Sequence, residues 1–394
     1  LMKIFVLLSR IPWPLEKGDK LRAFNQLKQL SKNNEIILCA LNSDRKANKK
    51  AAFAALQTYC KSISFIDLPG IGILLNLVVA WLNGDPLQTG YFYNTRAAKR
   101  IADLIDEHKP DILYGQLLRV AKYIRKTDLP KVIDYQDVFS MGMKRRLEVS
   151  SWLMKPFLMM EYLRLQRYEA DLFDDFDLKT IISETDQVLI PHPKRDEILI
   201  VPNGVDHEYF SPILADKKYE IVFTGNMAYP PNVNAAAFLV HEIMPLVWKK
   251  IPNARLLLAG ATPDVSIRQL ASDRVIVSGW MDDIRQAYAH ASVFVAPMRI
   301  GTGLQNKLLE AMSMAVPCVT TSLACKPLKA KEGVEILVGD TADQIAGLLI
   351  KLLNDSDFAN QIATAGHTFV HRNFSWEKAN EKLENAMKEI LKQD

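Results

Sequence analysis

The chain has 394 residues, enough for two domains with separate hydrophobic cores. Hydrophobic residues make up 49% and charged residues 24% of it, a composition typical of a soluble globular protein rather than a disordered or fibrous one. The net charge of +4 is too small to indicate nucleic acid as a partner.

In the first half, strand and helix patterns alternate along the chain. Short apolar runs predict strands at residues 3–9, 35–41, 63–67, 111–114, 131–134, 178–183 and 198–201. Longer stretches predict helices at residues 20–32, 49–60, 71–82, 97–108 and 150–173, and Pro156 is expected to bend or break the last of them. Turn residues at 202–206 then mark a domain boundary.

The second half restarts the same pattern. Strands are expected at residues 220–224, 255–259, 275–278, 293–296, 317–320 and 335–338. Helices are expected at residues 233–251, 265–271, 284–290, 304–314, 342–354, 357–370 and 376–392. This alternation predicts an α/β fold of two doubly wound Rossmann-like domains with parallel sheets, at residues 1–203 and 204–373, and ligands in the cleft between the sheets.

The most informative stretch of the chain is residues 299–312, RIGTGLQNKLLEAM, which joins an apolar strand to a helix. Gly301 and Gly303 leave backbone N–H groups bare beside a helix start, which favours the binding of phosphate oxygens. Lys307 adds a positive charge in the first turn of that helix.

Asn306, Lys307 and Glu310 can share one face of the helix. A carboxylate one turn beyond a phosphate site can accept two hydrogen bonds from ribose hydroxyls. The stretch therefore predicts a nucleotide-diphosphate site. Two alternatives remain open: a Gly-x-Gly turn without a ligand, and a dinucleotide-binding loop, although the latter would need a third glycine where Asn306 stands.

Several motifs together resemble a family 4 glycosyltransferase of the GT-B fold. The second half carries them continuously: VPNGVD at 201–206, FSP at 210–212, FTGNM at 223–227, PPN at 230–232, LAG at 258–260, GW at 279–280, QNKLLEAM at 305–312 and Pro317. Residues 10–19 resemble a subgroup of exopolysaccharide sugar transferases, whereas residues 67–178 match weakly. The resemblance implies that residues 374–394 form a helix that returns to the first domain.

The family's site residues transfer unevenly. The glutamate that holds the donor ribose falls on Glu310, but Thr302 stands where the family has another glutamate. Asn226 follows Gly225 where the family often has an arginine, and a later lysine is also missing. Two basic side chains that bind the donor diphosphate in the family are therefore absent from this chain.

Arg299 and Lys307 are our candidates to replace those cations. A surface salt bridge is the alternative for Arg299, as an ordinary helix ion pair is for Glu310.

In the first domain, Gly18 lies between the first strand and the first helix, where the resemblance implies a loop that faces the donor diphosphate. Asp19 could instead cap that helix. Asp137 follows another strand and is a candidate acceptor contact or base, with a turn or cap as its alternative. No Asp-x-Asp motif stands in a metal-binding context, so we expect neither a metal nor a cofactor.

The resemblance thus implies a glycosyltransferase that moves a sugar from a nucleotide-diphosphate donor to an acceptor hydroxyl, in surface polysaccharide or glycolipid synthesis. The resemblance implies retention of configuration without a metal. The alternatives are a sugar-nucleotide epimerase or hydrolase and a non-catalytic nucleotide-sugar-binding protein.

The four cysteines show no metal-ligand spacing and favour a reducing, cytoplasmic compartment; no signal peptide is expected. Basic residues accompany apolar ones at residues 144–167, which suits a segment at an anionic membrane surface that receives a lipid-linked acceptor. The alternative is that this segment packs into the core of the first domain and its basic residues are solvated. For residues 71–82, which are too few to span a bilayer, we favour packing into the core over membrane contact.

Overall fold

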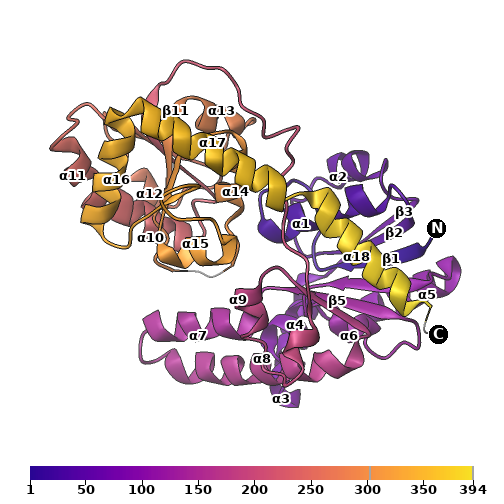
Figure 1. Cartoon of the computed structure of the whole chain (residues 1–394). Helices are drawn as coiled ribbons and strands as arrows, with labels where there is room; N and C mark the ends of the chain where they lie inside the picture. The colour runs from indigo at the N-terminus through magenta and orange to yellow at the C-terminus, as the bar shows by residue number, and fades with distance from the viewer. Residues whose placement is uncertain (301–302, 393–394) are drawn as a thin grey trace. The chain divides into compact units, whose positions relative to one another are not determined.

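The computed structural model describes residues 1–300 and 303–392, and the chain divides into two compact units (Figure 1). Leu1–Pro202 and Glu377–Asp394 form the first unit, and Asn203–Trp376 form the second. The first boundary lies after Pro202, whereas we predicted it after residue 203. The second lies after Trp376, whereas we predicted it after residue 373.

The first unit is built on a seven-stranded parallel sheet with the order β3-β2-β1-β4-β5-β6-β7. The strands are β1 (Lys3–Leu8), β2 (Glu35–Asn42), β3 (Ser62–Asp67), β4 (Ile112–Gln116), β5 (Lys131–Gln136), β6 (Leu178–Ile181) and β7 (Leu199–Ile200). The order reverses between β1 and β4, and in open α/β sheets ligands bind outside the strand ends at such a reversal.

Alternate residues of β1 enter two different hydrophobic cores, one on each face of the sheet. One face carries α1 (Gly18–Leu30), α2 (Lys49–Leu56) and α18 (Trp376–Ile390). The other carries α4 (Leu87–Phe92), α5 (Thr95–His108), α6 (Ala121–Ile124) and α8 (Lys155–Asp175). The unit also contains α3 (Gly70–Asn83), α7 (Phe139–Val149), α9 (Glu184–Gln187) and a 3-10 turn at Arg195–Glu197.

The second unit has a six-stranded parallel sheet with the order β10-β9-β8-β11-β12-β13. Its strands are β8 (Tyr219–Thr224), β9 (Leu256–Ala259), β10 (Val275–Gly279), β11 (Ala291–Ala296), β12 (Cys318–Thr320) and β13 (Leu337–Val338). Its helices are α10 (Pro230–Phe238), α11 (Met244–Trp248), α12 (Val265–Arg268), α13 (Arg285–Ala289), α14 (Asn306–Ser313), α15 (Ser322–Leu328), α16 (Ala342–Asn354) and α17 (Ser356–Asn373). The two doubly wound parallel sheets confirm the predicted fold class.

The helices depart from the predictions in the first unit. The helix predicted at residues 150–173 corresponds to α8, whereas α7 before it was not predicted. Pro156 does not bend or break α8, because it lies in the first turn, where a proline is tolerated. The short helices α4, α6 and α9 of this unit, and α15 of the second unit, were not predicted. Tertiary contacts hold such helices: the carboxylate of Glu161 on α8 accepts hydrogen bonds from the first backbone N–H groups of α4, at Leu87 and Gln88.

No helix in the described ranges combines the length and apolarity that a membrane crossing would need. The four cysteines, Cys39, Cys60, Cys318 and Cys325, are all buried and reduced. Burial raises the pKa of the Cys60 thiol to about 12, so this side chain behaves as a small apolar residue.

The terminal helix α18 belongs to the first unit, as the resemblance implied. Ala379, Leu383 and Met387 are buried in the core that also holds α1 and α2. Trp376, which we expected to pack on the first domain, is also buried but belongs to the second unit.

We therefore expect Leu383→Ala to destabilise the first unit by about 2–5 kcal/mol, because the helix would keep its place while a cavity replaced the leucine. The measurement is chemical denaturation followed by circular dichroism. Glu381→Ala, at an exposed position on the same helix, is the matched control and should change the free energy of unfolding by less than about 0.5 kcal/mol. Equal stability of the two variants would show that α18 does not anchor the unit.

Candidate active site

The second sheet reverses its strand order between β8 and β11, and the predicted donor residues follow these two strands. Gly225 comes directly after β8, and the segment after β11 leads into α14. In open α/β sheets, ligands bind at such a reversal, outside the carboxyl ends of the strands. The described donor residues of the second unit therefore share one edge of its sheet.

Two glycines keep the backbone bare at this edge. Gly225 has φ +152° and Gly260, after β9, has φ +142°, both unfavourable for residues with a side chain. A Cβ atom on Gly260 would lie 1.8 Å from the carbonyl oxygen of Gly225, and one on Gly225 would lie 2.7 Å from Nδ2 of Asn232. The close approach of the two backbones explains why Gly260 is a glycine. At Gly225 there is no room for a side chain beside Lys307.

Lys307 lies in the first turn of α14, and its ammonium group points to this bare backbone. Its Nζ donates a hydrogen bond of 2.5 Å to Oδ1 of Asn232 and lies 4.7 Å from the ring centre of Phe223. Desolvation lowers the pKa of Lys307 to about 7, and the charge of Glu310 opposes that shift only in part. The site holds a cation that an incoming anion would stabilise.

Glu310 lies one turn after Lys307 on the same helix. Its Oε2 accepts a hydrogen bond of 2.7 Å from the hydroxyl of Tyr288, which is fully buried and also lies 2.8 Å from Oγ1 of Thr224. Desolvation raises the pKa of Glu310, while Tyr288 and Lys307 act in the opposite direction. In the described part of the chain only Oε2 has a hydrogen-bond partner, so Oε1 is available to a ligand.

The remaining donor residues of the second unit lie around this pair. Asn306 accepts a hydrogen bond of 3.0 Å from Nδ2 of Asn203, and Asn226 accepts from the N–H of Ala228 and the hydroxyl of Thr262. Gly303 precedes α14 with φ +90°, a conformation suited to glycine. Gly301 and Thr302, which we also predicted to bind the donor, lie outside the described residues.

Arg299 has partners of its own in the structure. Its Nη1 lies 3.3 Å from Oε1 of Glu242, its Nε donates to Oδ1 of Asn234, and its guanidinium lies 4.0 Å from the ring centre of Phe238. The pair with Glu242 is solvent-exposed on both sides and therefore weak. A surface salt bridge was the alternative that we kept for Arg299, and a contact with donor phosphate would require this pair to open.

In the first unit, Gly18 is the first residue of α1, and a Cβ atom there would meet nothing within 4 Å. It follows β1, beside the strand-order reversal of the first sheet. Asp19 does not cap α1: Lys17 is the N-cap residue, and the Asp19 carboxylate lies 2.7 Å from Nη1 of Arg10. Gly18 thus leaves open space in front of the helix.

Asp137 follows β5, after Gln136 turns the chain with a left-handed φ of +60°. The residue is exposed, and its Oδ1 accepts a hydrogen bond from the N–H of Val138. Partial desolvation and the carboxylate of Asp186 raise the pKa of Asp137 to about 6, while Arg145 opposes them. Such a carboxylate can accept a proton near neutral pH.

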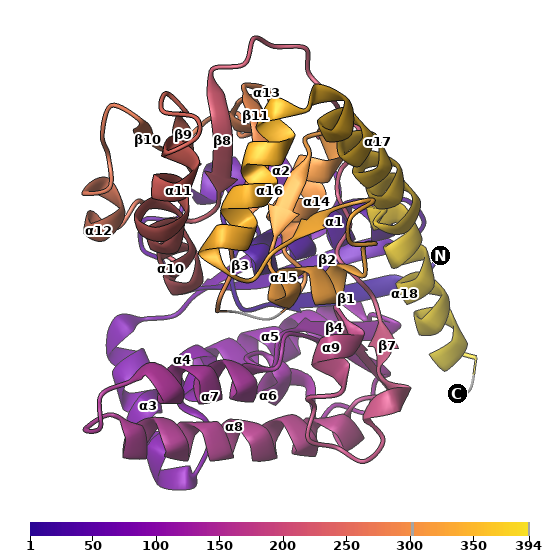
Figure 2. The ribbon, with the colours of Figure 1, turned by 60° about the vertical axis from the view of Figure 1, so that its left-hand side comes forward.

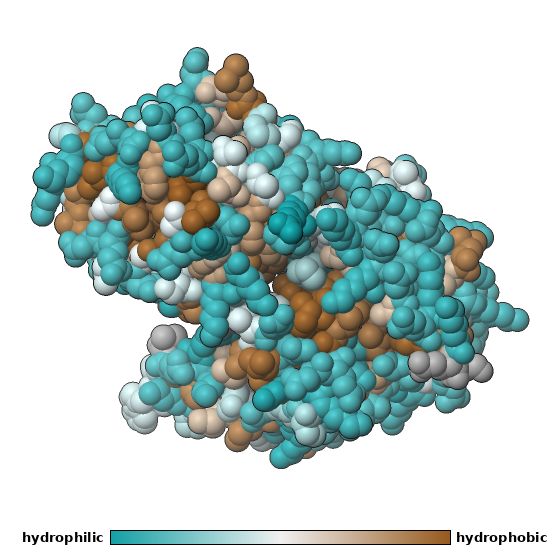
Figure 3. Space-filling model, viewed as in Figure 1, coloured by the Kyte–Doolittle hydropathy of each residue, from teal (hydrophilic) through white to brown (hydrophobic). Residues whose placement is uncertain are grey.

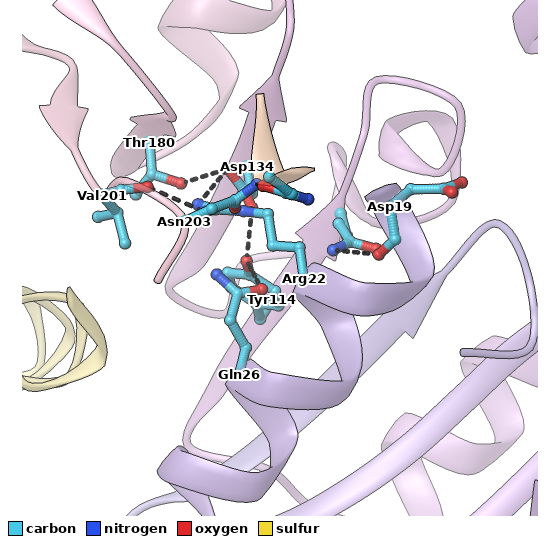
Figure 4. A network of polar contacts seen from close by, with 10 residues as sticks. Asp19, Arg22, Gln26, Tyr114, Asp134, Thr180, Val201 and Asn203 are labelled. Carbon is cyan, nitrogen blue, oxygen red and sulfur yellow. Dashed lines mark hydrogen bonds and ion pairs between the residues drawn. The ribbon is translucent and has the colours of Figure 1, made fainter. Parts of the chain in front are cut away.

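Asp134, three residues earlier, has a structural role instead. It is fully buried and paired with Arg22, whose Nε lies 2.6 Å from its Oδ2; Tyr114 and Thr180 donate to the same carboxylate (Figure 4). Arg22 also donates to the carbonyl of Val201. This network ties α1 to three strands of the sheet and so fixes the position of Gly18.

Tyr288, Thr224 and Asn232 are site residues that sequence reasoning missed. Asn232 belongs to the PPN motif, which could have suggested a partner for Lys307. Nothing in the local sequence distinguishes Tyr288 from an ordinary core aromatic, because its contact with Glu310 depends on how α13 and α14 pack.

The chain is similar to several known proteins. Residues 218–355 match the model of the family described as Glycosyl transferases group 1. The chain is 20% identical, over 95% of its own length and 97% of the other, to an uncharacterized 44.6 kDa protein in the cps region of Klebsiella pneumoniae.

A second relative is the GDP-mannose-dependent monoacylated α-(1-6)-phosphatidylinositol monomannoside mannosyltransferase of Corynebacterium glutamicum. It is 27% identical over 50% of this chain and 56% of that protein, so the match spans about half of each. Among solved structures, Anabaena HepE in complex with UDP and glucose superposes with a TM-score of 0.72 at 15% identity, over 99% of this chain and 100% of that one. At that identity the likeness shows the fold alone.

Proposed function

Since this chain is a glycosyltransferase of the GT-B type, we propose that it belongs to family 4 and transfers a sugar from a nucleotide-diphosphate donor to an acceptor hydroxyl with retention of configuration. The observation that carries the donor assignment is the pair Lys307 and Glu310, one turn apart on α14 beside the bare backbone of Gly225. A cation and a carboxylate at this spacing suit the diphosphate and the ribose of one nucleotide.

In this proposal, Lys307 and the backbone N–H groups at Gly225, Gly301 and Gly303 contact the diphosphate, with Asn226, Thr302 and Asn306 around them. The leaving group is a nucleoside diphosphate, whose negative charge grows as the bond to the sugar breaks. Fixed donors that stabilise this charge supply much of the rate enhancement. Because a lysine and several amides provide the positive charge, we propose that no metal is required. Arg299 would join them once its pair with Glu242 opens.

The first unit would supply the acceptor side of the reaction. We propose that Gly18 lets the loop after β1 approach the donor diphosphate closely and that Asp137 contacts the acceptor hydroxyl. The raised pKa of Asp137, about 6, would allow it to take the hydroxyl proton, with the donor phosphate as the alternative acceptor.

The acceptor that we favour is a lipid-linked sugar of surface polysaccharide or glycolipid synthesis. The name of the Corynebacterium relative specifies an acylated phosphatidylinositol acceptor, and the Klebsiella relative is encoded in a cps region. Such acceptors lie in a membrane, so we propose a cytoplasmic enzyme bound peripherally to the inner leaflet.

A transfer assay tests this function. The protein would be incubated with radiolabelled UDP- and GDP-sugars and a lipid extract as acceptor, and label in the lipid phase would be counted. We expect transfer that persists in EDTA and is lost in Lys307→Met. Release of free sugar alone would indicate a hydrolase, and nucleotide-sugar binding without either product would indicate a binding protein. Loss of transfer in EDTA, restored by Mg²⁺ or Mn²⁺, would contradict metal independence.

A further inference from the structure

Helix α3 presents a broad apolar face to solvent. Its exposed residues recur at helical spacing, so they form one continuous strip: Leu74, Leu75, Val78, Val79, Trp81 and Leu82, each between 51% and 70% exposed. The helix contains no charged residue at all. Our prediction that residues 71–82 pack into the core is therefore wrong for this face.

The opposite face of α3 explains why the large residues point outward. It carries the small residues Gly72, Asn76 and Ala80, spaced four apart. A Cβ atom on Gly90 of α4 would lie only 2.4 Å from the Cβ of Ala80, and Nδ2 of Asn76 donates to the carbonyl of Tyr93. Because α4 contacts α3 this closely, rotating α3 to bury its large side chains would break the packing.

A second apolar strip lies just before α8 and along its first half, and α3 lies beside α8 (Figures 1 and 2). Its exposed members are Trp152, Leu153, Met154, Phe157, Met159 and Leu163. In the view of Figure 3, hydrophobic side chains interrupt the hydrophilic surface in the region of α7 and α8. We call the two strips together the α3–α8 face.

Hydrogen bonds hold α8 to the C-terminal end of α3. Arg164 on α8 donates from Nη2 to the carbonyl of Trp81 at 3.0 Å and from Nη1 to the carbonyl of Asp85 at 3.3 Å. Glu161, one turn earlier, binds the start of α4, on which α3 rests. These contacts tie α3 and α4 to α8 in the structure.

Exposed basic side chains lie on α7 and on α8 near the α3–α8 face. They are Lys144, Arg146, Lys155 and Arg167, and the exposed carboxylates of the same two helices are Glu148, Asp171 and Asp174. An open groove of about 410 Å³ on α8 is lined by Pro156, Met159, Met160 and Leu163, with Arg164 and Arg167 also in its wall. Apolar side chains next to exposed cations match the acyl region and the phosphates of a lipid monolayer.

We propose that the α3–α8 face docks on an anionic lipid bilayer, with the apolar strip of α3 inserted among the headgroups and acyl chains and the basic residues of α7 and α8 on lipid phosphates. Soluble monomers rarely expose contiguous apolar surface of this extent. A second copy of this chain is a poorer occupant, because the basic residues of the two copies would repel each other. The proposal rests on the proposed function only in one respect: a lipid-linked acceptor would give the enzyme a reason to bind a bilayer.

Sedimentation with vesicles tests the proposal on the full-length protein without substrates. We expect binding to phosphatidylcholine vesicles that contain phosphatidylglycerol, and much weaker binding to phosphatidylcholine alone or at high salt. Replacing Leu75, Val79 and Leu82 by serine should weaken binding by about tenfold or more, as should replacing Lys144, Arg146 and Lys155 by glutamine. Leu214→Ser, at a fully exposed leucine of the second unit, is the matched control and should bind as wild type.

Tryptophan fluorescence separates insertion from simple charge attraction. Brominated acyl chains should quench part of the emission of the bound protein, and Trp81→Phe should remove a measurable share of that quenching. Wild-type protein that ignores anionic vesicles at low salt, or that self-associates through this face in solution, would overturn the proposal. Sugar transfer to detergent-dispersed acceptor would persist in that case, so the proposed function would stand or fall separately.

Discussion

Glu310→Ala should weaken the binding of a nucleoside diphosphate by about 2–3 kcal/mol, the cost of losing hydrogen bonds to a charged group. This corresponds to roughly 30- to 160-fold in Kd. In the structure, the hydroxyl of Tyr288 donates a hydrogen bond to Oε2 of Glu310, and Oε1 has no hydrogen-bond partner among the described residues. The carboxylate is therefore held in place and can still accept hydrogen bonds from a ligand. Isothermal titration calorimetry with UDP and GDP measures the effect.

Two controls isolate the ribose contact. Inorganic diphosphate, which has no ribose, should bind wild type and Glu310→Ala equally. A 2′,3′-dideoxy nucleotide should bind wild type as weakly as the natural nucleotide binds the variant, and the variant should not distinguish the two nucleotides. Glu310→Gln keeps an oxygen that can accept from Tyr288 and should lose less. Unchanged nucleotide affinity in a folded Glu310→Ala protein would remove this residue from the site.

Strand positions in this chain were predictable, because each strand of a doubly wound sheet is a short apolar run with its own turn signals. All the strands of both sheets lie where those runs predicted them, within a few residues. Short helices such as α4 escaped prediction because a distant residue, Glu161, stabilises their first turn. The outward face of α3 escaped because hydropathy alone does not tell a buried helix from one whose small residues face the protein.

The site was predictable to the extent that its residues are consecutive. Lys307 and Glu310 share a helix, and their spacing alone places them on one face. The partners of that pair come from α10, α13 and β8, and no local pattern connects them. Arg299 shows the limit of such reasoning: its sequence neighbours indicate a phosphate contact, but its side chain lies over Phe238 and pairs with Glu242.

The affinity for a nucleoside diphosphate should fall as the pH rises above 7. Desolvation holds the pKa of Lys307 at about 7 in the free protein, and a bound diphosphate would raise it by adding negative charge. Above pH 7 the complex must therefore take up a proton, which weakens binding by about tenfold per pH unit until the pKa of the complex is reached. The terminal phosphate itself titrates near pH 6 and adds little between pH 7 and about 9.

Calorimetry in buffers of different ionisation enthalpy should detect the uptake of up to about one proton per bound nucleotide at pH 8. Lys307→Met should abolish this uptake and weaken diphosphate binding at pH 7 by about 1.5–3 kcal/mol, while nucleoside binding stays the same. Lys307→Arg is the matched control: it keeps the cation, has no titration in this range, and should bind without the pH dependence. If wild-type affinity is flat from pH 7 to 9, or if Lys307→Met loses nucleoside and diphosphate binding equally, Lys307 does not contact phosphate, and the positive charge at this site must come from elsewhere.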